Sequence, residues 1–213
     1  MYLGLLGSVD YNRIISPSAR FLDVRLQKFD RYELGYSGGL SLGFELGNWE
    51  IQTGAVYSYK NYRPLQAEFW DGAFDEGYAK VQLKDIELNI VQLPLLFRYN
   101  LLQYDSWRFY VLAGGTVHVA VSANYYYDNI GTPNPKVLEP NRGWFDGGTF
   151  RENSYMTANV GVGLERFMSP RWSLFAQPTY HHAINLVNHG MGPSRDRIST
   201  MSIYTGVRIR VRR

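Results

Sequence analysis

Strict alternation between apolar and small or polar residues is the feature of this sequence that most constrains its fold. The pattern is clearest over residues 34–47. Every second residue there is apolar or aromatic apart from one glycine: Leu34, Tyr36, Gly38, Leu40, Leu42, Phe44 and Leu46. The residues between them are small or charged: Gly35, Ser37, Gly39, Ser41, Gly43, Glu45 and Gly47. A helix would spread the apolar residues around its circumference, so the pattern predicts a β-strand with one apolar face.

Seven further segments alternate in the same way and are rich in β-branched and aromatic residues, which favour strands. They cover residues 2–11, 49–60, 84–101, 109–127, 155–168, 171–183 and 199–211. The segment 84–101 changes phase near Val91 and Gln92. This predicts a β-bulge beside Pro94, a residue that cannot donate to the ladder. The 213 residues are therefore predicted to form one all-β domain over 1–213.

The connections between these strands alternate between long and short. Only Gly47-Asn48, residues 103–106 and Ser169-Pro170 join the closely spaced pairs, whereas the other connections are long. Short periplasmic turns and long extracellular loops are typical of outer-membrane barrels. We therefore expect an eight-stranded antiparallel up-and-down transmembrane β-barrel in a bacterial outer membrane. An even number of strands puts both termini at the short-turn end, on the periplasmic side.

The many aromatic residues, 17 Tyr, 11 Phe and 5 Trp, support this interpretation. If the apolar faces point to lipid, the rings form two belts, because amphipathic rings prefer the headgroup level. The belt near the short turns contains Trp49, Phe97, Tyr99, Phe109 and Trp172, and the other contains Tyr11, Tyr36, Tyr57, Tyr59, Tyr125 and Tyr180. The residues expected to face outer-membrane lipid include Leu40, Leu42, Phe44, Val117, Val119, Val160 and Ile203, and those expected to face inward include Gly39, Ser41, Gly43, His118 and Asn159. No stretch approaches the roughly 20 apolar residues of a transmembrane helix.

Glycine-based motifs recur along nearly the whole chain: GYSGGL at 35–40, WEIQTG at 49–54, QLPLL at 92–96, YVLAGG at 110–115, GVGLE at 161–165 and QPTY at 177–180. Together they resemble the porin-like outer-membrane β-barrel family related to the OmpA and OmpX barrels. The resemblance implies the fold and the outer-membrane location, and it covers many roles. Such chains commonly end in an aromatic residue, whereas this one ends in Val211-Arg212-Arg213. The sequence also begins without a signal peptide, so we expect a mature form or a piece of a longer protein.

Charged residues on the second face predict the content of the lumen. An eight-stranded barrel is just filled by its own side chains, so buried charges inside it must be paired. By strand phase, the charges in the short-turn half of the lumen are Glu45, Glu50, Glu165, Arg98, Arg208 and Arg210. We expect a structural salt-bridge cluster, in which Arg98 is adjacent to Glu50 and the arginines of the last strand reach acids across the barrel. A gated proton or ion path is the alternative.

Catalytic and metal-binding signals are weak. His181 and His182 lie near the long-loop rim, followed by His189, Ser194 and Asp196, and lipid-modifying enzymes use these residue types at this height. His118 is expected to be a hydrogen-bonded lumen histidine. The acidic run 71–76 could bind calcium through carboxylates, but its spacing is not that of an EF-hand, which favours a solvated loop.

Other sites are not indicated by the sequence. It contains no Cys, no phosphate-binding glycine loop and no zinc-ligand spacing, so neither a cofactor nor a metal is predicted. The net charge of +3 is too small to indicate nucleic-acid binding.

Three classes of function remain open. The first is a non-enzymatic outer-membrane barrel that acts as a structural, adhesion or accessory subunit through its extracellular loops or its outer wall, where it could dock on a larger complex. The second is a lipid-modifying enzyme that uses the rim histidines. The third is a soluble lipocalin-like barrel, which would place the apolar faces inside around an apolar ligand.

Overall fold

The protein is described by a computed structural model, which places residues 1–15, 33–62, 68–70, 80–129, 136–141, 150, 153–186, 189–191 and 197–211. Eight long strands form a barrel among these residues: β1 (Tyr2–Ile15), β2 (Glu33–Leu46), β3 (Trp49–Tyr62), β5 (Lys80–Gln103), β6 (Trp107–Asn129), β8 (Asn153–Phe167), β9 (Trp172–Ala183) and β11 (Arg197–Arg210). Three short strands accompany them: β4 (Glu68–Trp70), β7 (Lys136–Asn141) and β10 (Gly190–Met191). The predicted fold class is confirmed, and each predicted strand has its counterpart.

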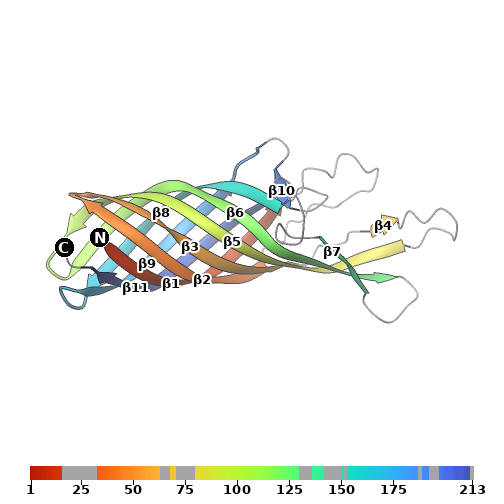
Figure 1. Cartoon of the computed structure of the whole chain (residues 1–213), viewed down its shortest axis with the longest axis horizontal. Helices are drawn as coiled ribbons and strands as arrows, with labels where there is room; N and C mark the ends of the chain where they lie inside the picture. The colour runs from red at the N-terminus through yellow and green to blue at the C-terminus, as the bar shows by residue number, and fades with distance from the viewer. Residues whose placement is uncertain are drawn as a thin grey trace.

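The barrel closes because every long strand pairs antiparallel with two neighbours. The order runs β1-β2-β3-β5-β6-β8-β9-β11, and β11 pairs with β1 to complete the ring. Both termini lie at the end that carries the short turns (Figure 1). One of these turns begins at Gly47, whose φ of 65° is a conformation that glycine adopts without strain.

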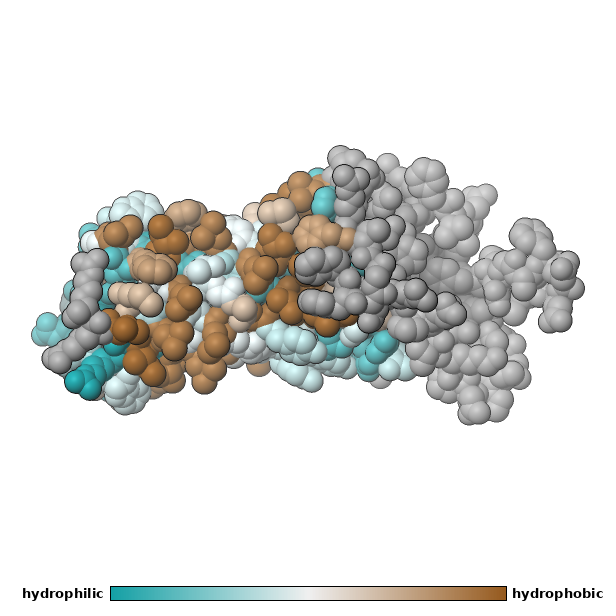
Figure 2. Space-filling view, viewed as in Figure 1, coloured by the Kyte–Doolittle hydropathy of each residue, from teal (hydrophilic) through white to brown (hydrophobic). Residues whose placement is uncertain are grey.

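The apolar faces of the strands point outward and the opposite faces point into the lumen, the reverse of the arrangement in a water-soluble barrel. In β9 the side chains alternate strictly between exposed and buried, and the exposed set includes Trp172, Leu174 and Tyr180. Apolar side chains cover much of the outer wall (Figure 2). The five residues predicted to face inward are buried or nearly so, and Leu40, Leu42, Phe44, Val160 and Ile203 are exposed on the wall as predicted. Among the described residues, no helix is long and apolar enough to span a bilayer.

One prediction about the faces is wrong, because Val119 is only 6% exposed. Val117 is partly exposed and alternates with the buried residues Thr116 and His118, so it lies on the outward face as predicted. The predicted bulge beside Pro94 is absent, since Pro94 stays in register with Thr116.

The inward phase of β5 continues unbroken from Gln92 back to Leu88. Leu88 and Ile90 are 0% exposed and share the inward phase of Gln92. The irregularity lies in the partner strand instead, where pairing passes from Asn89–Ser122 to Ile90–Ala120 and leaves Val121 as an extra residue. The alternation misleads here because this end of the lumen contains apolar residues.

Strands β5 and β6 are much longer than the others. They contain 24 and 23 residues, whereas the other six barrel strands contain 12 to 15. At about 3.3 Å per residue, β5 spans about 80 Å. A strand needs only about 9–11 residues to cross a membrane. The outer parts of β5 and β6, with β4 and β7 paired to them, form a sheet that projects beyond the barrel at the end opposite the termini (Figure 1). We call this sheet the extension.

Candidate functional site

The lumen near the short turns is filled by paired charges. Arg98 Nη1 of β5 lies 2.5 Å from Glu50 Oε1 of β3, and each side chain is 1% exposed. The two residues are direct partners in the ladder between their strands. Arg98 also donates from Nη2 to Gln177 Oε1 at 2.6 Å, and Tyr2 donates its hydroxyl to Glu50. Both charges therefore have additional partners, which a buried ion pair requires.

Glu165 of β8 is shared by two arginines. Arg108 Nη2 and Arg208 Nη1 lie 2.6 Å and 2.7 Å from the same oxygen, Oε2. Ser173 donates its hydroxyl to the other carboxylate oxygen. Arg108 is absent from the sequence-based prediction because the strand was expected to begin at Phe109, whereas β6 begins at Trp107. The alternation itself puts residue 108 in the inward phase.

Glu45 connects these buried charges to the rim of the barrel. Its Oε1 accepts hydrogen bonds from Arg108 Nη1 at 2.8 Å and from Arg210 Nη2 at 3.1 Å. Arg210 thus joins the predicted cluster through Glu45, but its side chain is 41% exposed, because β11 ends at this residue and it lies at the open mouth. We define the lumen charge cluster as Glu45, Glu50, Arg98, Arg108, Glu165, Arg208 and Arg210.

Two tyrosines that lie over glycines support the cluster. Tyr2 is the ladder partner of Gly43, and Tyr110 is the partner of Gly163. A Cβ added at either glycine would come within 2.0 or 2.1 Å of the tyrosine ring, so the space exists only because the side chain is missing. The Arg98 guanidinium lies 3.9 Å from the centre of the Tyr110 ring, in cation–π geometry.

An apolar layer crosses the lumen next to the charges. Leu6, Val56, Phe175 and Tyr204 form a buried cluster. The cavity that they line with other residues has a volume of about 20 Å³, enough for about one water molecule. Among the described residues, the lumen at this level is therefore a packed core, as expected for eight strands.

A second polar cluster lies on the far side of this layer and was not predicted. Lys60 is buried, donates to Asn12 Oδ1 at 2.6 Å and has its Nζ 3.5 Å from Asp10 Oδ2. Asp10 also accepts hydrogen bonds from four serine hydroxyls, those of Ser8, Ser37, Ser58 and Ser202. The signal is present in the sequence, because Asp10 lies between Val9 and Tyr11 on the inward phase of its strand, and Lys60 follows the outward residue Tyr59.

The paired histidines of β9 point to opposite faces. His181 is 5% exposed, and its Nδ1 lies 2.8 Å from Asn159 Oδ1 in the lumen. His182 is exposed on the outer wall. The two rings therefore do not share one site. Ser194 and Asp196, their predicted companions, lie outside the described residues.

The other histidines are not arranged for nucleophilic catalysis either. His189 Nδ1 lies 3.3 Å from Ser154 Oγ, but that hydroxyl donates its single proton to Phe150 O at 2.6 Å. An activated serine must instead give its proton to the base. His118 is buried in the lumen, with Nε2 3.0 Å from Thr157 Oγ1.

The described residues contain no group of three or more His, Asp or Glu side chains that could hold a metal ion. The acidic run 71–76 lies outside them.

The predicted belt residues lie on the outer wall wherever their side chains are described. All of these are exposed or partly exposed: Trp49, Phe97, Tyr99, Phe109, Trp172, Tyr11, Tyr36, Tyr57, Tyr59 and Tyr180. Trp49 packs against Tyr99 with ring centres 4.8 Å apart, and Tyr36 stacks on Tyr59 at 5.1 Å. The side chain of Tyr125 is outside the described parts of the chain.

The wall becomes polar toward the long-loop end of β3, β5 and β6. Tyr57 donates its hydroxyl to Asn89 Oδ1 at 2.7 Å, and Asn89 Nδ2 donates to Ser122 Oγ at 2.7 Å. Closer to the extension, Tyr126 donates its hydroxyl to Glu87 Oε2 at 3.2 Å. Hydrocarbon offers polar groups no partner, so this hydrogen-bonded ladder suits the headgroup level and the water beyond it.

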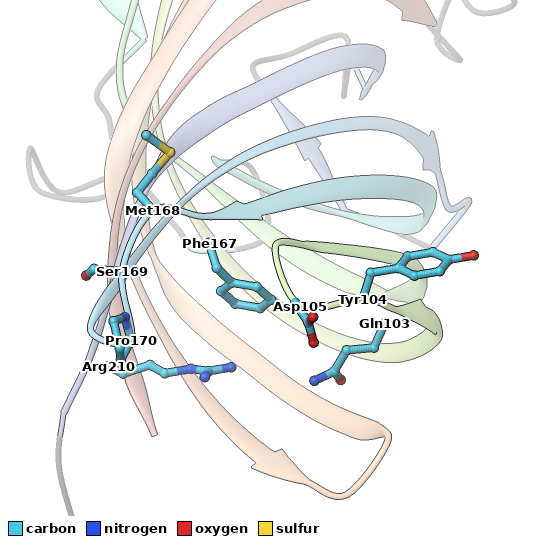
Figure 3. A pocket seen from close by; sticks show the side chains of 8 residues that line it. All are labelled: Gln103, Tyr104, Asp105, Phe167, Met168, Ser169, Pro170 and Arg210. Atoms are coloured by element: carbon cyan, nitrogen blue, oxygen red, sulfur yellow. The ribbon is translucent and has the colours of Figure 1, made fainter.

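A pocket of about 510 Å³ opens at the short-turn end of the barrel. Figure 3 shows the side chains that line it: Gln103, Tyr104, Asp105, Phe167, Met168, Ser169, Pro170 and Arg210. The Phe167 amide donates to Ser106 O at 2.8 Å and so fixes the β5–β6 turn against the end of β8.

Two comparisons with known proteins, a family model and one solved structure, agree with this architecture. The model of the outer membrane protein β-barrel domain family matches residues 3–142. The fold is similar to that of Neisserial surface protein A, with 11% identity, a TM-score of 0.50 and coverage of 98% of this chain and 97% of that chain. Ail, the attachment invasion locus protein of Yersinia pestis, has 11% identity, a TM-score of 0.39 and coverage of 97% of both chains. The N-terminal β-barrel domain of Pseudomonas aeruginosa OprF has 13% identity, a TM-score of 0.38 and coverage of 97% of this chain and 96% of that chain. No curated protein matches the sequence.

Proposed function

The chain belongs to the family of outer membrane protein β-barrel domains, and on this basis we propose that it is a non-enzymatic barrel that holds the extension outside the cell for contact with a partner. In this proposal the short turns and both termini are periplasmic. The partner is a surface outside the cell or another subunit of an outer-membrane assembly, so the role is structural, adhesive or accessory.

The observation that carries this proposal is the length of β5 and β6. Each has about twice the residues that a membrane crossing requires. Their outer parts are not bare loops, because β4 and β7 pair with them and widen the sheet. A paired sheet held on a rigid barrel is suited to binding, since functional surfaces commonly lie on connections positioned by a stable scaffold.

The packing of the lumen also supports the proposal, because it disfavours transport through the barrel. The lumen charge cluster and the apolar layer beside it fill the barrel with ion-paired or tightly packed side chains. A lipocalin-like function requires an apolar interior, whereas here the apolar faces point outward and the interior is mainly polar. The enzyme alternative lacks a histidine placed to activate a nucleophile among the described residues.

Site-specific photocrosslinking in the bacterium that makes the protein tests the proposal. A photoreactive phenylalanine analogue replaces Tyr126, which lies on the extension side of the polar ladder. The matched control carries the same analogue at Leu42, on the lipid-facing wall. We expect discrete protein or glycan adducts from position 126 and only lipid adducts from position 42. Protein adducts from position 42 with none from 126 would mean that the barrel works through its wall, and the proposal would be wrong.

A further inference from the structure

The lumen charge cluster is not neutral. It contains three carboxylates and four guanidinium groups, and all of these are joined through ion pairs within it. Arg98, Arg108 and Arg208 are buried against carboxylates, so their charges are compensated at close range. Arg210 shares Glu45 with Arg108 and is the exposed arginine of the cluster. The cluster therefore carries one excess positive charge, and Arg210 is its solvent-exposed arginine, at the mouth of the barrel.

Arg210 faces the pocket between the short turns (Figure 3). Its guanidinium lies 4.9 Å from the centre of the Phe167 ring, and the Arg108 guanidinium lies 5.4 Å from the centre of the same ring. Asp105 lines the same pocket from the β5–β6 turn. Among the described residues, Asp105 makes no ion pair and Arg210 makes one, to Glu45. The pocket thus presents a cation and an anion that do not neutralise each other.

We infer that this pocket binds the phosphoethanolamine head group of a phospholipid, with the phosphate on Arg210 and the ammonium on Asp105. A guanidinium presents a planar set of donors that fits phosphate oxygens, and an ammonium has three donors for a carboxylate. The volume of about 510 Å³ accommodates such a group. This inference goes beyond the proposed function, because it concerns the opposite end of the barrel.

The position of the pocket favours a lipid as the source of the head group. Trp107 and Trp172 are exposed on the wall at the same end, and tryptophan marks the headgroup level of a bilayer. Arg166 lies over the Trp107 ring at 5.2 Å and adds a further cation near that level. Leu164 and Leu174 are exposed on the wall above and offer an apolar surface for acyl chains.

Native mass spectrometry of the delipidated full chain in detergent tests the inference. Phosphatidylethanolamine, phosphatidylcholine and phosphatidylglycerol are added at equal concentration. We expect phosphatidylethanolamine to be retained best, because the choline nitrogen has no N–H to give to Asp105 and the glycerol head group has no cation. Arg210→Gln should lower phosphatidylethanolamine retention about tenfold, in line with the loss of hydrogen bonds to a charged group. Asp105→Asn should remove the preference for phosphatidylethanolamine over phosphatidylcholine.

The control variant is Arg13→Gln. It removes an exposed arginine at the long-loop end of β1, away from the pocket, and should leave phosphatidylethanolamine retention unchanged. Thermal unfolding of each variant shows that the barrel is intact, and Asp105→Asn, on an exposed turn, keeps the test valid if Arg210→Gln unfolds. Unchanged retention in a folded Arg210→Gln protein overturns the site. Displacement of the lipid by an equal concentration of glycerophosphoethanolamine, which lacks acyl chains, overturns the lipid source in favour of a soluble phosphoester.

Discussion

Arg98 and Glu50 are 48 residues apart in the sequence, yet they face each other across the β3–β5 ladder with 2.5 Å between Nη1 and Oε1. This contact depends on register, because a slip of one residue would turn one of the two side chains out toward lipid. The pair therefore links the strand pairing of the barrel directly to the electrostatics of its lumen.

Replacing Arg98 by Ala should destabilise the barrel strongly. Glu50 would keep its charge in a site that is 1% exposed and would lose its nearest cation. The loss of one partner from a buried pair typically costs about 3–5 kcal/mol. Urea unfolding in detergent measures the free energy, and Arg171→Ala, at an exposed turn residue, should change it by less than about 0.5 kcal/mol.

The double variant Arg98→Ala/Glu50→Ala should cost less than the sum of the two single changes, because neither buried charge is then left alone. Strict additivity of the two single effects would mean that the pair does not interact in the folded protein.

Gly163→Ala should also destabilise the barrel, through packing and not through charge. The added methyl group would meet the Tyr110 ring at 2.1 Å, and overfilling a packed site costs about 1–3 kcal/mol. Gly38→Ala is the matched control, since its Cβ would have 3.8 Å to the nearest backbone oxygen. Equal stability of the two variants in thermal unfolding would show that the ring does not depend on this glycine.

His181→Ala and His182→Ala should leave the lipid composition of the membrane unchanged. One ring is bound to Asn159 inside the barrel and the other lies on the outer wall, so they do not form one catalytic site. Mass spectrometry of extracted lipids checks this. A lipid product that is lost in either variant, at equal protein level, would favour the enzyme alternative.

The fold could be predicted because the two faces of every strand meet different surroundings. Lipid outside and a filled lumen inside impose the period-two pattern, as the run from Leu34 to Gly47 illustrates. The same alternation is enough to predict that four charged side chains lie in one region of the lumen: those of Glu50, Arg98, Glu165 and Arg208. Arg108 is missing from the prediction only because the predicted strand begins at Phe109, two residues after the start of β6, which is within the usual uncertainty of an element boundary.

The predictions fail where the polar or apolar character of a residue does not match the face of the barrel on which it lies. Leu88 and Ile90 are apolar, as lipid-facing residues are, yet they fill the apolar end of the lumen. The extra residue opposite Asn89 and Ile90 is Val121 of β6, and an alternating sequence does not reveal which of two paired strands carries a bulge. The exposure of Arg210 depends on where β11 ends relative to the rim, which alternation does not encode.

The central claim is that the lumen is a packed core and that the protein acts through the extension outside the membrane. Single-channel recording is the most direct test of this claim. The purified full chain is incorporated into a planar lipid bilayer, and current is recorded at both polarities at neutral pH. We predict no stepwise conductance, because paired charges and the apolar layer of Leu6, Val56, Phe175 and Tyr204 leave room for about one water molecule. Reproducible, ion-selective steps from the folded wild-type protein would contradict the account and would make the lumen a path for ions.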